Sequence, residues 1–308
     1  MVSISVIGPN GSGKTHFYTL LAYHLNRHVQ AQTGQSLVRQ MEVRGAVKTN
    51  DGRIASFFDL YERLRFGYKL PSTAPPALDE GPWTLQINFT TPPRFRLLPG
   101  KKVQLTLLDL SGEVLRRIMN MIVDVKKGVM TQQDFDKELA LLGIDPQRFD
   151  ELVTYAFRSD IYIYVINLYT IASLWGDSKA GVQIPDIVAK YANFLDAYKF
   201  YNDEKPPKAL GVVFTFFDRA ERLLMNLGLM TPEEIQRKDY SQVARRLGRL
   251  LGEALNLAGA TNVEYFISYT KELDENRFKT TITREGEMLL DYPASEYDRI
   301  ISWLAANA

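Results

Sequence analysis

The sequence predicts an α/β fold, a three-layer sandwich built around a mostly parallel sheet. Two observations indicate it. Six short runs of apolar and β-branched residues recur along the 308 residues, and most are separated by segments with helical spacing. Four of these runs are almost wholly apolar, as is typical of strands buried on both faces of a parallel sheet. The runs are Val2–Ile7, Trp83–Thr90, Val103–Asp109, Ile161–Leu168, Leu210–Phe217 and Val263–Ser268. We therefore expect a six-stranded sheet with one antiparallel edge strand, in one domain spanning 1–308.

The first run leads directly into a glycine-rich segment that matches G-x-x-x-x-G-K-[ST], the phosphate-binding loop. Its glycines allow successive backbone N–H groups to point inward at phosphates. Lys14 supplies a cation for the terminal phosphates, and the Thr15 hydroxyl can ligate Mg²⁺. A helix expected from Thr15 to about Asn26 adds the positive end of its dipole to this anion site. The residues expected to hold a nucleotide here are Gly8, Asn10, Gly11, Ser12, Gly13, Lys14, Thr15 and His16.

The second and third runs are expected to form an antiparallel hairpin at the sheet edge. Trp83–Thr90 alternates apolar and polar side chains, which is typical of a half-exposed strand. A short connection rich in Pro and Gly joins it to Val103–Asp109. In phosphate-loop proteins a carboxylate at the tip of such a strand holds the Mg²⁺ shell, so Asp109 is a candidate metal ligand. Gly112 can offer its N–H to a γ-phosphate, whereas a helix-capping role for Asp109 is the alternative.

Strand, phosphate loop, helix, hairpin and the segment Asp109–Glu113 together resemble the Ras-like P-loop GTPases. The motif pattern is most similar to the prokaryotic and archaeal double-GTPase-type small GTPases. The resemblance implies a molecular switch that binds GTP or GDP with Mg²⁺ and acts through protein regulators or effectors. It also implies a Mg²⁺ ligand from the Pro-rich stretch 70–76, with Thr73 as the first candidate and Ser72 as the second. An ordinary Pro-rich loop is the alternative for that stretch.

The ends of the last two runs carry the residues that the resemblance assigns to the base. Asp218 stands where these GTPases accept hydrogen bonds from guanine N1–H and N2–H₂. Within the same motif Thr215 replaces Asn and Phe216 replaces Lys, and a Phe ring could still stack on a purine. Ser268 and Tyr269 resemble the segment whose backbone contacts the base, with Tyr269 in place of a small Ala. Guanine is favoured over adenine, and an ATP-binding ATPase or kinase is the alternative.

Hydrolysis of GTP is expected to be slow. Glu113 occupies the position where Ras-like enzymes place a Gln that orients the attacking water. A carboxylate can hold water, but it also adds negative charge beside the γ-phosphate. The expected catalytic set is Lys14, Gly112 and Glu113. A pseudo-GTPase scaffold, which binds nucleotide structurally or not at all, is a further alternative.

The resemblance implies that the stretch 70–76 is switch I and that Asp109–Glu113 is switch II. Two segments exceed a minimal domain of this kind, at about 27–82 near switch I and at 114–157 after switch II. The second is expected to be helical, and the apolar stripe of its first helix packs onto its own sheet or forms a partner surface. The further expected elements are helices at Leu115–Lys127, Thr131–Leu142 and Pro146–Phe157, an amphipathic helix within 239–258, and a β-excursion at Phe278–Pro293 before a last helix at Ser295–Ala306.

Composition restricts the classes of partner. The net charge of +1 gives no global field for nucleic acid, so none is expected as a ligand. The absence of cysteine excludes disulfides and thiolate metal sites, and with only 3 histidines a histidine-based zinc site is not expected. No apolar run approaches the length of a membrane span, and no N-terminal signal is visible. We expect a cytoplasmic protein that reaches a membrane only through a partner.

Overall fold

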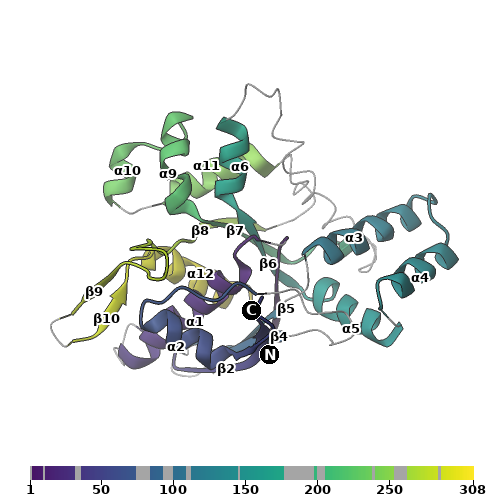
Figure 1. Ribbon diagram of the computed structural model, residues 1–308, viewed down its shortest axis with the longest axis horizontal. Helices are drawn as coiled ribbons and strands as arrows, with labels where there is room; N and C mark the ends of the chain where they lie inside the picture. Colours follow the sequence, from purple (N-terminus) through teal and green to yellow (C-terminus); the bar gives the residue numbers. More distant parts are fainter. Residues whose placement is uncertain are drawn as a thin grey trace.

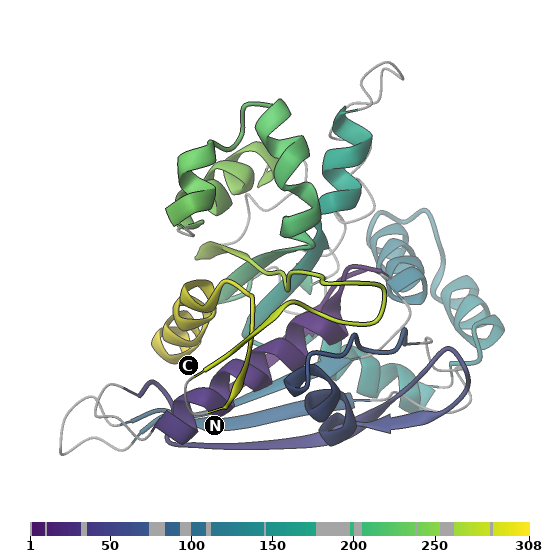
Figure 2. The same cartoon turned by 60° about the vertical axis from the view of Figure 1, so that its left-hand side comes forward.

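A central sheet covered by helices on both faces forms the structure (Figures 1 and 2), here a computed structural model. It describes residues 2–9, 11–31, 36–73, 84–92, 100–108, 112–144, 146–176, 198–199, 205–237, 240–252, 262–283 and 286–308. None of the helices within these ranges has the length and apolar character needed to cross a membrane.

The sheet has eight strands in the order β3-β2-β4-β5-β1-β6-β7-β8. All six predicted runs form strands, as β1 (Val2–Ile7), β4 (Thr84–Thr90), β5 (Lys102–Leu108), β6 (Ile161–Asn167), β7 (Ala209–Thr215) and β8 (Val263–Ile267). The last five strands in the spatial order are parallel, and β4 pairs antiparallel with β5 as the hairpin predicted. The α/β class with a largely parallel sheet is therefore confirmed.

The prediction of six strands with β4 at the edge was wrong. Strands β2 (Gln40–Lys48) and β3 (Ile54–Ser56) continue the sheet beyond β4 by antiparallel pairing. Side chains of β2 alternate between exposed and partly buried, as expected for a strand with one covered face. Gly45 interrupts this alternation in the sequence, which hid the strand inside the segment 27–82.

Gly45 lies where β2 meets β4, and its backbone has φ of +106°. A Cβ atom added there would lie 1.9 Å from the carbonyl oxygen of Thr84. We predict that Gly45→Ala lowers the free energy of unfolding by at least about 2 kcal/mol, through strain and displacement of β4. Gly52→Ala is the matched control, because Gly52 has φ of +82° but nothing within 4 Å of an added Cβ. Urea denaturation of both variants checks this, and equal losses would contradict it.

Two groups of helices cover opposite faces of the sheet. The first group packs with side chains such as Ile163 and Val165 of β6, and the second with Tyr164 and Ile166 of the same strand. On the first face lie α1 (Lys14–Ala31), α2 (Phe57–Arg65) and α12 (Ala294–Asn307); on the second lie α3 (Gly112–Lys126), α4 (Gln132–Leu141), α5 (Pro146–Phe157), α6 (Leu168–Gly176), α9 (Phe217–Asn226) and α11 (Ser241–Gly252). The remaining elements are α10 (Pro232–Arg237) and the hairpin of β9 (Thr280–Ile282) with β10 (Met288–Leu290).

Ser56 ends β3 and begins α2. Its hydroxyl accepts a hydrogen bond from the Asp59 N–H, and the Asp59 carboxylate accepts from the Ser56 N–H, which forms a reciprocal capping box. Helix α2 therefore begins directly after the three-residue strand β3, inside the segment 27–82.

The apolar stripe of α3 packs inside the molecule. Met119, Ile122 and Val123 are buried, and the first two pack with residues of α4, α5 and the sheet. Of the two expectations for this stripe, packing within the chain is confirmed for these three residues.

Candidate functional site

The loop between β1 and α1 begins in close contact with β6. A Cβ at Gly8 would lie 2.4 Å from the carbonyl oxygen of Val165, so only glycine fits at this crossing. Lys14 starts α1, is 8% exposed, and donates from Nζ to the carbonyl oxygens of Gly8 and Pro9, both at 2.9 Å. The Lys14 ammonium therefore bridges the end of the loop to the backbone at its start.

Two side chains from neighbouring strand ends hold the loop in place. Asn167, at the end of β6, donates from Nδ2 to the Gly11 carbonyl oxygen at 3.0 Å. The hydroxyl of Thr215, at the end of β7, lies 2.6 Å from the Ser12 carbonyl oxygen and 3.0 Å from that of Ile166. Because β1, β6 and β7 are parallel, their carboxyl ends meet at one edge, which is where open α/β sheets bind ligands.

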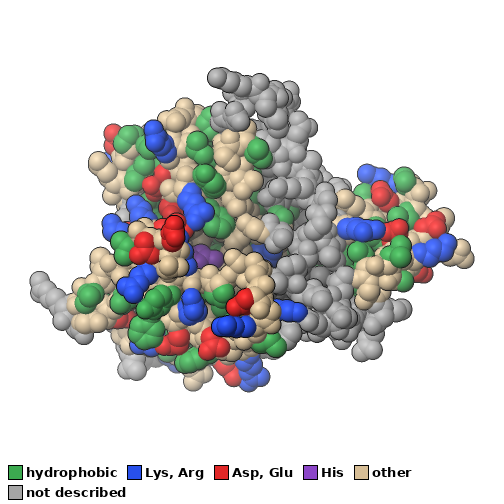
Figure 3. All heavy atoms as spheres, viewed as in Figure 1, with side chains coloured by type: hydrophobic (Ala, Val, Ile, Leu, Met, Phe, Trp, Pro, Cys, Tyr) green, Lys and Arg blue, Asp and Glu red, His purple; other side chains and the backbone are tan. Residues whose placement is uncertain are grey.

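A cavity of about 520 Å³ opens beside this loop. Its lining comes from the loop and α1, from the ends of β7 and β8, and from the segment before and within the predicted switch I stretch. Figure 3 shows charged side chains of both signs around a hollow in this face, with a histidine visible in it. The predicted site residues that line the cavity are Gly11, Gly13, Lys14, Thr15, His16, Ser72, Thr73, Asp218, Ser268 and Tyr269.

Phe216 directs its ring to the glycine loop. It is the one non-glycine residue of the described part with positive φ, at 54°, and it precedes α9. A Cβ at Gly13 would lie 3.0 Å from the ring, so loop and ring are in contact. The Arg219 guanidinium lies 5.3 Å from the ring centroid, within the range of a cation–π interaction.

Asp218 lies in the first turn of α9 and borders the cavity. Burial raises the pKa of its carboxyl above the ordinary value, while the nearby Arg219 guanidinium opposes the rise. A partly buried carboxylate in the first turn of a helix can accept hydrogen bonds from N–H groups of a ligand in the cavity.

His16 links the first turn of α1 to the segment after β8. Its Nε2 lies 2.9 Å from the Thr270 hydroxyl, and its ring packs against Phe278 with centroids 5.1 Å apart. Desolvation lowers the pKa of His16 to about 4, and Arg219 adds to the effect, so the ring is neutral at pH 7.

The side chains of Ser268 and Tyr269 turn away from the loop. The Ser268 hydroxyl lies 2.7 Å from the hydroxyl of Tyr297 in α12, and Tyr269 stacks on Phe217 with its hydroxyl 3.2 Å from that of Tyr240. The Ser268 N–H is used as well, because it donates to the carbonyl oxygen of Phe214 at 2.9 Å.

An ion cluster at the rim was not foreseen from the sequence. Glu272 pairs with both Arg219 and Lys69, the latter at 3.0 Å, and all three border the cavity. The cluster joins the start of the predicted switch I stretch to α9. Thr73, the first candidate Mg²⁺ ligand of that stretch, pairs with Thr49 in an isolated β-bridge and also borders the cavity. The one hint of this ion cluster in the sequence was that Arg219 directly follows the predicted site residue Asp218.

Several predicted residues lie wholly or partly outside this description. Asn10 and Asp109 are outside the described residues. Gly112 is the first residue of α3, and Glu113 follows it, with its side chain outside the description. Of Ser12, the hydroxyl is buried without a hydrogen-bond partner among the described residues.

No family model and no curated protein matches the sequence. Among solved structures, the chain is similar to the signal recognition particle receptor SRb-GTP/SRX complex from Chaetomium thermophilum, with 14% identity, coverage of 87% of this chain and 93% of that chain, and a TM-score of 0.27. The 2,6-sialyltransferase of Vibrionaceae Photobacterium sp. JT-ISH-224, in a complex with CMP and lactose, has 9% identity, coverage of 86% and 53%, and a TM-score of 0.15. The functional assignment therefore rests on the residues of the cavity.

Proposed function

We propose that the chain is a Mg²⁺-dependent guanine-nucleotide-binding switch with slow intrinsic GTP hydrolysis. One observation carries the proposal. A cavity of about 520 Å³ is bordered by the phosphate-loop residues Gly13, Lys14 and Thr15 and also by Asp218 with the segment after β8. That volume lies within the range of nucleotide-sized ligand sites.

The residues of the cavity divide into two chemical groups under this proposal. Lys14 and the loop backbone bind the phosphates, and Thr15 and Thr73 ligate Mg²⁺ together with Asp109. Asp218 accepts from the base, beside the backbone of Ser268 and Tyr269. Regulators or effectors would contact the segments 27–82 and 114–157 around the two switches, and Glu113 would make hydrolysis slow.

A nucleotide panel tests the proposal. The unfolding midpoint is measured with GTP, GDP, ATP and ADP in Mg²⁺, and affinities follow from competition against a fluorescent GDP analogue. A ligand that binds only the folded state raises the midpoint in proportion to the logarithm of its concentration over its dissociation constant. GTP and GDP should raise it most. Tighter binding of ATP would support an ATPase or kinase, and no effect of any nucleotide would support the scaffold alternative.

The Thr215 hydroxyl offers a finer test of the loop. We predict that Thr215→Val weakens GDP binding by roughly tenfold, because the Ser12 carbonyl loses its contact and the loop loses an anchor. Thr154→Val is the control, since the Thr154 hydroxyl donates to the Asp150 carbonyl oxygen within α5 and lies outside the cavity lining. Unchanged GDP affinity in Thr215→Val would remove the anchoring role.

A further inference from the structure

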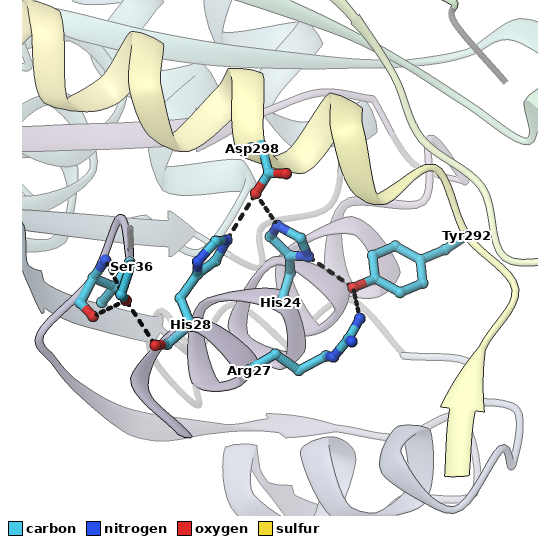
Figure 4. Close-up of polar contacts among 7 residues, drawn as sticks. His24, Arg27, His28, Ser36, Tyr292 and Asp298 are labelled. Carbon is cyan, nitrogen blue, oxygen red and sulfur yellow. Dashed lines mark hydrogen bonds and ion pairs between the residues drawn. The ribbon is translucent and has the colours of Figure 1, made fainter. Parts of the chain in front are cut away.

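A cluster of two histidines and an aspartate joins α1 to α12, outside the cavity. His24 and His28 are four residues apart and share one face of α1. Their Nε2 atoms lie 2.8 Å and 2.7 Å from the same oxygen, Oδ1 of Asp298 in α12 (Figure 4). The two rings are edge to face with centroids 5.0 Å apart.

The three ligand atoms have the spacing of a metal site. All lie within 4.8 Å of one another. Tetrahedral Zn²⁺ with bonds of about 2.0–2.1 Å needs about 3.3 Å between neighbouring ligand atoms. Each contact to Oδ1 would therefore widen by about 0.5 Å. The His24 side chain is 5% exposed and the Asp298 side chain 46%, so the cluster is buried on one side and open to water on the other.

A second layer of side chains orients His24. Its Nδ1 lies 2.7 Å from the Tyr292 hydroxyl, and the Arg27 guanidinium donates to the same oxygen at 3.1 Å (Figure 4). A hydroxyl can donate to a ring nitrogen or accept from it. The Tyr292 hydroxyl can thus accept a hydrogen bond from Nδ1–H of His24 while the Nε2 lone pair binds a metal ion. This is the arrangement found around metal-binding histidines.

We propose that His24, His28 and Asp298 bind a divalent transition-metal ion, with Zn²⁺ as its best representative, and that this ion fastens α12 to α1. Imidazole nitrogen with one carboxylate suits Zn²⁺ and its neighbours, whereas Mg²⁺ and Ca²⁺ prefer oxygen ligands. Water completes the coordination on the side left open by Asp298. The site is independent of the nucleotide proposal. It runs counter to the expectation, drawn from the count of histidines, that no histidine-based zinc site occurs, and a titration with Zn²⁺ decides between the two.

Direct metal binding tests the site. Untagged protein is freed of metal with EDTA, dialysed into a phosphate-free buffer without nucleotide, and titrated with ZnSO₄ by calorimetry. We expect about one ion per chain and a rise of the unfolding midpoint that EDTA reverses. Co²⁺ in place of Zn²⁺ should give the intense visible bands of tetrahedral coordination.

Four variants distinguish this site from others. His28→Ala and Asp298→Asn each remove one ligand and should weaken Zn²⁺ binding by more than about tenfold, while Tyr292→Phe, which changes only the second layer, should weaken it by roughly tenfold. His16→Gln removes the remaining histidine of the chain and should leave Zn²⁺ affinity unchanged. Circular dichroism verifies folding, and Asp298→Asn preserves side-chain volume if His28→Ala is unstable.

Each contrary result overturns the proposal. Equal Zn²⁺ affinity of the wild type and both ligand variants would show that binding occurs elsewhere. Loss of binding in His16→Gln would place the ion at the cavity. No heat of Zn²⁺ binding together with no Zn²⁺-dependent rise of the unfolding midpoint would show that the cluster is only a hydrogen-bonded contact between the two helices.

Discussion

Lys14→Ala should lower the affinity for GDP and GTP by roughly 10- to 100-fold, the equivalent of one or more lost hydrogen bonds to a charged group. In the structure Lys14 is nearly buried and bound to the carbonyl oxygens of Gly8 and Pro9. Its substitution therefore removes both the phosphate-binding cation and the closure of the loop. Equilibrium titration with a fluorescent GDP analogue measures the loss.

A control for Lys14→Ala tests whether the loss of any lysine charge lowers GDP affinity or only the loss of the charge at the site. Lys137→Ala removes an exposed lysine paired with Asp134 in α4 and should leave GDP affinity unchanged. At one fixed GDP concentration the unfolding midpoint of Lys14→Ala should rise less than that of the wild type. If that variant and the wild type show the same midpoint in GDP and the same nucleotide affinity, the scaffold alternative replaces the switch.

Asp218→Asn should lower GDP affinity on the order of 100-fold and transfer the preference to xanthosine diphosphate. The carboxylate offers two acceptors to guanine N1–H and N2–H₂. Asparagine offers one acceptor and one donor, which match the N1–H and the 2-oxo group of xanthine. Competition between the two diphosphates for the fluorescent analogue measures the transfer.

The control for base recognition is Glu272→Gln. Glu272 borders the same cavity and carries the same charge, but it pairs with Arg219 and Lys69 at the rim. It should change affinity for both diphosphates by a similar factor, without a transfer of preference. An Asp218→Asn variant that still prefers GDP, or a wild type that prefers ADP, would exclude the guanine assignment.

Most strands that the sequence predicted are apolar runs whose side chains face two covering layers, whereas β4 was recognised by its alternation. An apolar run such as that of β6 has one structural outcome, because helices bury both of its faces. Strand β2 was missed because it is half exposed and because Gly45 replaces the side chain that would have continued its alternation. Because β2 was missed, β4 was wrongly predicted to be the edge strand. The residues of a strand do not by themselves indicate which strand pairs with its outer side.

The candidate site was predictable where backbone geometry dictates residue type. Positions 8 and 13 require glycine because the backbone there closely approaches Val165 and Phe216. The spacing of these glycines therefore makes the motif recognisable in the sequence. The ion pairs of Glu272 with Lys69 and Arg219 join three segments that are far apart in the chain. A local sequence pattern cannot predict such contacts. The same holds for His24 and Asp298, which meet only because α12 packs beside α1.

The shortness of β3 bears on how the molecule behaves among copies of itself. This strand forms one edge of the sheet, and its Ile54 side chain is 62% exposed. An edge strand offers unpaired backbone groups to any other chain, which makes long, apolar edges templates for aggregation. Here the capping box at Ser56 turns the backbone into α2 after three residues, so β3 itself offers only a short ladder to another chain. The cap of one helix thus also sets the length of the edge strand that precedes it.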